Sequence, residues 1–301
     1  MSRPSLRQLE YAVAVADELH FRRAAERVAV TQPALSQQIK LLEEQLGVRL
    51  FERDARKVLM TPAGEDLVRR ARLILGEVDQ LCDNAAAAGE PLSGSLRMGV
   101  IPTVAPYLLP RVLPEVRTSY PRLRLLLHED QTGRLIDMLV EGKLDVLLLA
   151  LGVRGTEAEG LTALRIFDEP FWLATPIDHP LARRETVCES DLLDQDVLLL
   201  EDGHCLREQA LAVCRTGGAR ESADVRATSL PTLAQMVASG MGITLLPECA
   251  VPHETERGGA LAVRRFDAPA PSRAIGLLYR ASSGRDREFR LLRDSIRGAL
   301  G

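Results

Sequence analysis

The feature that most constrains the fold is a set of three short helical patterns at the N-terminus, joined by connections of only a few residues. The first helix is predicted by apolar residues at helical spacing, Leu6, Leu9, Val13 and Ala16. Residues 21–28 form the second pattern. Thr31 is expected to be the N-cap of the third helix, which Pro33 opens and Gly47 ends. Two helices joined by a tight turn, the second beginning with small polar residues, are typical of a recognition helix that enters the DNA major groove.

The outer face of the third helix carries side chains that we expect to contact DNA. It lies opposite an apolar stripe formed by Leu35, Ile39, Leu42 and Leu46. Glutamine can form two hydrogen bonds with an adenine edge, whereas lysine binds guanine or phosphate. Residues 51–60 resemble a two-stranded wing that brings basic side chains to the DNA backbone. The predicted DNA-binding residues are Arg22, Gln32, Pro33, Ser36, Gln37 and Lys40 in the helices and Arg53, Arg56 and Lys57 in the wing.

A long helix is expected to follow over residues 62–86, before a hinge of small residues at 85–94. Its apolar stripe consists of Leu67, Val68, Ala71, Leu75, Val78 and Leu81. An apolar stripe on a helix that projects from a small domain is typical of a subunit interface. We therefore predict dimerisation through this helix, so that two recognition helices read a two-fold related DNA site.

Charge and composition are compatible with this division of the chain. The whole sequence has a net charge of −4, but residues 1–61 hold ten Lys and Arg against eight Asp and Glu, or +2, which leaves −6 for the rest. A hydrophobic content of 46% with 27% charged residues is typical of a folded protein and excludes disordered and collagen-like chains. We find no signal peptide and no apolar run long enough to span a membrane, so we expect a cytoplasmic protein.

From residue 95 onwards, short apolar runs alternate with amphipathic helices, which predicts parallel α/β organisation with ligands at the carboxyl ends of the strands. The first set of predicted strands is 96–101, 124–128 and 145–150, with helices at 107–118 and 134–141. The second set has strands at 171–174, 197–200, 225–228 and 243–246 and a helix at 231–239. A strand at 275–279 and a final helix at 286–297 are expected to return to the first set.

Two of the five cysteines, Cys205 and Cys214, lie nine positions apart in a stretch that otherwise reads as one helix. Nine positions correspond to about 2.5 turns and roughly 13.5 Å along the axis. A disulfide needs Cα atoms about 4.4 to 6.8 Å apart, so joining this pair requires the helix to unwind. The pair is therefore either inert or a switch. Lone cysteines are most often small buried hydrophobes, which is our expectation for Cys82, Cys188 and Cys249.

The N-terminal motifs resemble those of the LysR-type transcriptional regulators. The matching segments are Phe-Arg-Arg-Ala-Ala at 21–25, Thr-Gln-Pro-Ala-Leu-Ser-Gln-Gln-Ile at 31–39, Leu-Gly at 46–47 and Leu-Phe-Glu-Arg at 50–53. The resemblance implies a winged helix-turn-helix DNA-binding domain at 1–61, a dimerisation helix and hinge at 62–94, and an effector domain at 95–301 built as two periplasmic-binding-protein-like lobes. Lobe I would comprise about 95–167 and 272–301, and lobe II about 168–271.

The effector domain is similar to that of the peroxide-sensing members of the same family. The similarity covers residues 101–104, 106–110, 128–132, 198–210 with Cys214, 226–230 and 242–247, whereas Gly133 stands where a larger residue is expected. It implies that Cys205 attacks hydrogen peroxide to give a sulfenic acid and that Cys214 resolves this product as a reversible disulfide. Thr103, Thr132 and His204 would bind the peroxide. A thiol reductant such as glutaredoxin would reset the pair, and a dimer of dimers on promoter DNA could contact RNA polymerase.

The residues around Cys205 fit this chemistry. A sensor thiol must be partly ionised at neutral pH, and the first turn of a helix favours negative charge. We expect Asp202 or Gly203 to cap this helix, with His204 and Arg207 supplying donors or positive charge near the thiol.

Two other functions are also compatible with the sequence. A LysR-type regulator could bind a small organic ligand between its lobes, with the cysteines incidental, and a thiol peroxidase could consume peroxide catalytically. We find no phosphate loop, dinucleotide fingerprint or serine nucleophile elbow. The spacing of His204, Cys205 and Cys214 does not suit zinc. We therefore expect no enzyme activity, metal or cofactor.

Overall fold

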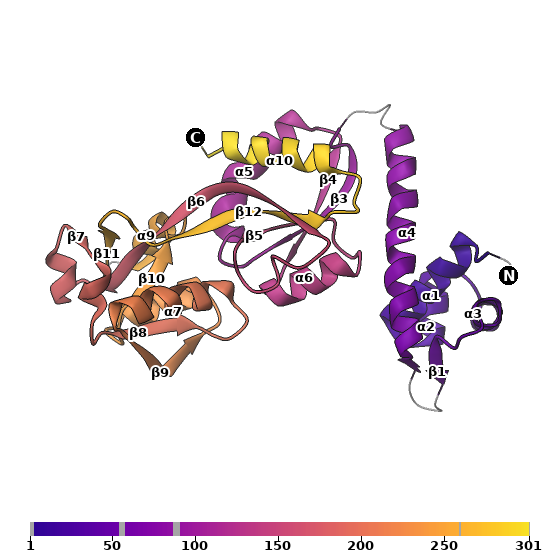
Figure 1. Ribbon diagram of the computed structural model, residues 1–301, viewed down its shortest axis with the longest axis horizontal. Coiled ribbons are helices and arrows are strands. Elements are labelled where there is room, and N and C mark those ends of the chain that lie inside the picture. Colours follow the sequence, from indigo (N-terminus) through magenta and orange to yellow (C-terminus); the bar gives the residue numbers. More distant parts are fainter. Residues whose placement is uncertain (1–2, 54–57, 87–90, 259, 301) are drawn as a thin grey trace. The chain divides into compact units, whose positions relative to one another are not determined.

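The computed structural model describes residues 3–53, 58–86, 91–258 and 260–300 (Figure 1). The chain divides into two compact units, one of Met1–Glu90 with Val140–Lys143 and one of Pro91–Leu139 with Leu144–Gly301. Within the described residues, we find no helix with the length and apolar character needed to cross a membrane.

The first unit begins with three helices, α1 (Leu6–Glu18), α2 (Phe21–Arg27) and α3 (Gln32–Leu46). Helix α1 starts in a capping box, in which Ser5 and Gln8 each bond the backbone of the other. The single apolar stripe predicted for α1 covers less of the helix surface than the structure buries. Because α2, α3 and α4 (Pro62–Ala86) all pack on α1, its buried side also includes Tyr11, Ala12, Ala14 and Val15, while Leu6 is exposed.

Helix α3 matches its prediction closely. Leu35, Ile39 and Leu42 are fully buried. Thr31 is the N-cap residue, although its side chain makes no capping hydrogen bond, and Gly47 ends the helix at a φ of 70°. The left-handed conformation at this position favours glycine, which explains why the helix stops there.

A short antiparallel ribbon and a long helix complete the first unit. Strands β1 (Phe51–Arg53) and β2 (Val58–Met60) pair as the predicted wing. The first half of α4 packs into the unit through Val68 and Ala71, which are buried. Its second half exposes Ile74 and Leu81, the latter by 70%. This exposed apolar surface is compatible with the predicted dimerisation helix.

The second unit is built on an eight-stranded sheet of order β4-β3-β5-β12-β6-β11-β7, in which β10 also pairs with β6. Its strands are β3 (Gly94–Val100), β4 (Leu123–Glu129), β5 (Val146–Ala150), β6 (Leu161–Pro176), β7 (Thr186–Val187), β10 (Thr244–Pro247), β11 (Leu261–Phe266) and β12 (Ser272–Arg280). Strands β3, β4 and β5 are parallel, whereas β12 is antiparallel to β5 and β6. The sheet is therefore mixed rather than wholly parallel.

Two lobes share this sheet, and each has its own hydrophobic core. Lobe I carries α5 (Ala105–Ser119), α6 (Thr132–Val140) and α10 (Asp286–Gly298) around β3, β4 and β5. Lobe II carries α7 (Cys205–Gly217), α8 (Leu230–Ala238) and α9 (Val251–Gly258), with the parallel pair β8 (Asp196–Leu200) and β9 (Arg220–Ala227). The long strand β6 connects the lobes, because it pairs with β12 in lobe I and with β10 and β11 in lobe II (Figure 1).

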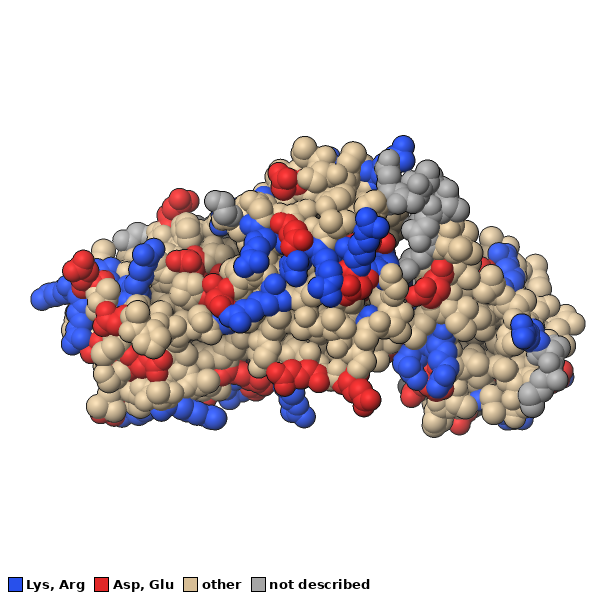
Figure 2. All heavy atoms as spheres, turned by 45° about the horizontal axis from the view of Figure 1, so that its top comes forward, with Lys and Arg blue, Asp and Glu red and all other residues tan. Residues whose placement is uncertain are grey.

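Basic and acidic side chains lie interspersed on the face of the molecule that Figure 2 shows. Mixed charge of this kind is typical of a solvated protein surface and offers no large field of one sign there.

Candidate functional site

A pocket of about 330 Å³ lies in the second unit, between the N-terminal ends of α6 and α7 and the loop that follows β5. It brings together three of the residues singled out from the sequence, Thr132, His204 and Cys205. The other lining residues are Gly133, Ile136, Asp137, Val153, Arg154, Gly155, Gly203 and Glu208. Thr103 is not among them.

Cys205 is the first residue of α7 and is only 5% exposed. The N-cap is His204, in an extended conformation and without a side-chain capping bond, so the predicted cap at Asp202 or Gly203 is wrong. Gly203 has a φ of 97°, outside the extended region that an N-cap residue normally adopts, and the helix therefore begins later. Cys205 therefore lies in the first turn of α7, where the partial positive charge of a helix N-terminus is concentrated.

His204 is buried beside the thiol and is 7% exposed. Burial lowers the pKa of His204 below its ordinary 6.5, although Glu201, whose Oε1 lies 3.9 Å from Nε2, acts in the opposite direction. The imidazole is therefore neutral at neutral pH. A neutral imidazole has one donor nitrogen and one acceptor nitrogen, which suits it to hold a small hydroxylic molecule.

Thr132 begins α6 and contributes a hydroxyl group to the pocket. The Oγ1 atom is buried and has no hydrogen-bond partner among the described residues. Buried polar groups normally have a partner, so this hydroxyl group keeps unused hydrogen-bonding capacity beside the pocket.

Thr103 lies in a buried network with Arg273 and Glu169, two residues that were not predicted from the sequence. Arg273 donates to Thr103 Oγ1 at 2.9 Å and to its carbonyl oxygen at 3.0 Å, and forms an ion pair with Glu169 at 2.8 Å. Arg273 and Glu169 are cross-strand partners in the pairing of β12 with β6. They are 104 residues apart in sequence, so no local pattern could have indicated the pair.

The same arginine lies within electrostatic reach of the Cys205 thiol. Burial lowers the pKa of Arg273, but Glu169, Cys249 and Cys205 raise it, and the net effect is a rise. Arg273 therefore keeps its positive charge in the interior, where charge interactions are screened less than at the surface. It is a buried cation that interacts electrostatically with the Cys205 side chain.

Arg207, which we expected to supply positive charge near the thiol, has other partners. Its guanidinium binds Asp202 at 2.9 Å and Glu221 at 2.6 Å, and donates to the Leu200 carbonyl at 3.2 Å. Two carboxylates balance its charge, so its main effect is to fix α7 against β8 and β9.

Cys214 lies in the same helix as Cys205 but in a different core. Cys205 packs within the lobe I core and Cys214 within the lobe II core, where it is 4% exposed. The nine-position separation on a regular helix corresponds to roughly 13.5 Å along the axis. Burial, together with Glu221, raises the pKa of Cys214 to about 11, so that it remains a thiol at neutral pH. The two cysteines therefore have distinct environments.

The other cysteines do not all fit the expectation of small buried hydrophobes. Cys82 is exposed because it lies in the outer half of α4, and Cys188 and Cys249 are half-buried. Cys188 sits at the start of a 3-10 helix, where its sulfur lies 3.0 Å from Ser190 Oγ. Within the described residues, no group of three or more His, Cys, Asp or Glu could hold a metal ion.

Most of the predicted DNA contacts of the first unit lie on its surface. Arg22, Gln32, Pro33, Gln37 and Lys40 are exposed and Ser36 is half-buried, whereas Arg56, Lys57 and the side chain of Arg53 lie outside the described residues. Arg22 pairs with Glu26 at 3.2 Å and Lys40 with Glu44 at 3.7 Å, exposed pairs that are worth little and can open for a phosphate.

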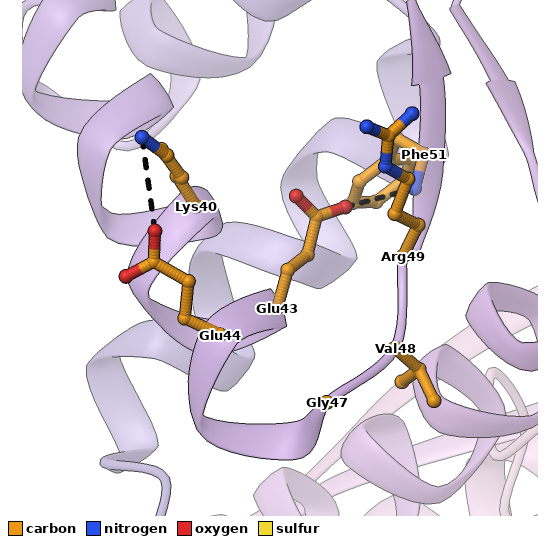
Figure 3. Close-up of a pocket in the computed structure, with 7 residues that line it drawn as sticks. All are labelled: Lys40, Glu43, Glu44, Gly47, Val48, Arg49 and Phe51. Carbon is orange, nitrogen blue, oxygen red and sulfur yellow. Dashed lines mark hydrogen bonds and ion pairs between the residues drawn. The ribbon is translucent and has the colours of Figure 1, made fainter.

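In a groove beside the C-terminal end of α3, the side chain of Glu43 fixes the path of the chain towards the wing. Glu43 Oε1 accepts a hydrogen bond from the backbone N–H group of Leu50 at 2.8 Å. It accepts a second one from the backbone N–H group of Phe51 at 3.2 Å (Figure 3). Lys40 lies on the same side of this groove as Glu44, to which it is paired (Figure 3). The hydrogen bonds of Glu43 thus have a structural role, because they join the recognition helix to β1.

Comparisons with known proteins agree with both units. The family of bacterial regulatory helix-turn-helix proteins of the lysR type matches residues 6–65, and the LysR substrate binding domain matches residues 89–301. A probable hydrogen peroxide-inducible genes activator from Streptomyces viridosporus is 50% identical over 99% of this chain and 95% of its own length.

Solved structures extend the similarity to the whole fold. Full-length OxyR from Pseudomonas aeruginosa, in a cysteine-to-aspartate variant, has a TM-score of 0.81 at 38% identity over 99% of this chain and 96% of that chain. A hydrogen peroxide-bound OxyR variant from Corynebacterium glutamicum has a TM-score of 0.69 at 41% identity over 99% and 93%. The chain therefore belongs to the LysR family of bacterial transcriptional regulators and, within that family, to the OxyR regulators.

Proposed function

We propose that this protein is a hydrogen peroxide-sensing, DNA-binding regulator of antioxidant genes that acts in the cytoplasm. Residues 1–61 would read promoter DNA, 62–94 would provide the dimerisation helix and hinge, and 95–301 would sense the peroxide; residues 87–90 of that hinge lie outside the described part of the chain. The observation that carries the proposal is the position of Cys205 at the start of α7, in one pocket with Thr132 and His204.

The first chemical step is attack of the Cys205 thiolate on one oxygen of the peroxide. The S–O bond forms as the O–O bond breaks, sulfur loses two electrons, and the departing oxygen takes a proton and leaves as water. That oxygen must be hydrogen-bonded or protonated as it leaves. The neutral imidazole of His204 and the unsatisfied hydroxyl of Thr132 are the donors proposed for this role, and Arg273 holds the buried Thr103 in place by a hydrogen bond to its hydroxyl group.

The second step is condensation of the sulfenic acid at Cys205 with the Cys214 thiol, which forms the S–S bond and releases water. A regular α7 holds the sulfurs too far apart for this bond. Its formation therefore requires α7 to unwind and at least one cysteine to leave its core. A thiol reductant such as glutaredoxin would restore both thiols by exchange.

The conformational change in α7 would be transmitted to the DNA-reading units through a homo-oligomer, which we propose to be a dimer of dimers. The exposed Ile74 and Leu81 of α4 are available for subunit contact. A change in the sensing unit could then alter the spacing of the DNA-reading units on a two-fold related site. In its new position on the promoter, the oligomer would then contact RNA polymerase.

DNase footprinting on the protein's own promoter tests this function. We expect the protected region to change after a brief hydrogen peroxide pulse and to return after treatment with a dithiol reductant, because only the thiols are altered. An unchanged footprint would contradict the proposal, and a change caused instead by a small organic metabolite would identify a ligand-binding regulator. Rapid peroxide turnover with no effect on DNA binding would indicate a thiol peroxidase.

A further inference from the structure

The pocket in front of Cys205 is larger than hydrogen peroxide requires. One water molecule needs only about 10–15 Å³ of water-accessible space, so a molecule of two oxygens uses less than about a tenth of the 330 Å³. The pocket has two ends that differ in burial. Thr132, His204 and Cys205 are buried, whereas Gly133 and Gly155 are exposed. The unused volume therefore lies towards the exposed end.

Two glycines, Gly133 and Gly155, line that end without side chains. A Cβ atom added at Gly133 would meet nothing within 4 Å, so the space in front of it is open. Gly155, at a φ of 90°, approaches Ile136 so closely that an added Cβ would lie 3.0 Å from Cδ1. Ile136 and Val153 supply apolar surface beside these glycines. The exposed end thus offers room and apolar contacts for a small hydrocarbon group.

The charged residues at this end favour a neutral occupant. Asp137 and Glu208 contribute two negative charges and Arg154 one positive charge, which sum to −1, and all three are exposed. His204 adds no positive charge at neutral pH, because burial lowers its pKa. A site of this net charge disfavours anions relative to neutral molecules.

We propose that the pocket also admits neutral organic hydroperoxides with a small alkyl or aryl group and that these oxidise Cys205. The inference rests on the proposed function, since it assigns a second class of oxidant to the same thiol. The thiolate attacks the terminal oxygen of the hydroperoxide, the S–O bond forms and the O–O bond breaks. Sulfur is oxidised by two electrons, and the departing alkoxide takes a proton to become an alcohol. The organic group occupies the space beside Gly133.

The test compares rate constants for Cys205 oxidation in the full-length protein with hydrogen peroxide and with tert-butyl hydroperoxide, followed by mass spectrometry of quenched samples. In Gly133→Leu, the ratio of the organic rate to the hydrogen peroxide rate should fall about ten-fold, or about 1.4 kcal/mol. Gly133→Ala should give a smaller fall. Gly298→Leu is the matched control and should keep the original ratio, because Gly298 is also helical with open space around it but lies outside the pocket.

The outcomes separate this inference from the function on which it rests. Oxidation by hydrogen peroxide but not by tert-butyl hydroperoxide would overturn the inference alone, as would an unchanged ratio in Gly133→Leu. Failure of both peroxides to oxidise Cys205 would overturn the proposed function as well. A carboxylate-bearing alkyl hydroperoxide should react more slowly than the neutral one, and equal rates would contradict selection by the charges of Asp137 and Glu208.

Discussion

Replacement of Cys205 by serine is expected to abolish the peroxide-dependent change in the promoter footprint completely. A serine hydroxyl is not oxidised by peroxide and cannot form a disulfide, so the helix that begins at this position keeps its reduced conformation. The variant should still bind the promoter, because Cys205 lies in the second unit and the DNA-reading helices in the first. The measurement is the footprint of each protein before and after the same peroxide pulse.

Cys188→Ser provides the matched control, since Cys188 lies at the start of a 3-10 helix, outside both the pocket and the predicted dimerisation helix. It should respond like the unmodified protein. Cys214→Ser should stop the reaction after the first step and leave a sulfenic acid at Cys205 that a dimedone reagent traps. A peroxide-dependent footprint that persists in Cys205→Ser would show that the response does not pass through this thiol.

Replacement of Arg273 by methionine is expected to lower the free energy of unfolding by about 3–5 kcal/mol, because it leaves Glu169 buried without its ion partner. The arginine side chain is fully buried and also donates two hydrogen bonds to Thr103. The loss can be measured by urea unfolding of the reduced full-length protein, followed by a signal from the second unit.

Two further variants show whether the buried pair is the cause. Arg290→Met removes an arginine that is half-exposed and pairs with Asp286 within α10, and it should cost no more than about 1 kcal/mol. The double variant Glu169→Gln with Arg273→Met should recover part of the loss, because no unpaired charge then remains in the interior. A loss below about 1 kcal/mol in Arg273→Met would contradict the importance assigned to the pair.

The parts of the structure that were predictable from sequence are those that local patterns specify. Helix α3 buries Leu35, Ile39 and Leu42 as its periodicity requires, and Gly47 ends it. Helix α7 contains both Cys205 and Cys214, so the geometric argument about their separation stands. Spacing along one helix is a local property, and a single sequence is enough to read it.

The parts that were missed depend on contacts between distant segments. The pairing of β12 with β6 brings Arg273 to Glu169, and β6 is one strand of 16 residues of which only a short piece was predicted. The burial of α1 was misjudged because three other helices cover it. Cys82 is exposed for a related reason, since the outer half of α4 also leaves the apolar residues Ile74 and Leu81 exposed. Local periodicity shows that a face is apolar but not what packs against it.

The two thiols of α7 give the proposed switch its distinctive property, because the bond between them cannot form while the helix is intact. Mass spectrometry of the full-length protein after a brief hydrogen peroxide pulse, with free thiols alkylated before proteolysis, tests this point. We predict a peptide pair joined through Cys205 and Cys214 that disappears on treatment with a dithiol reductant. Finding only intermolecular or mixed disulfides at Cys205, with Cys214 still alkylated, would contradict the intramolecular switch.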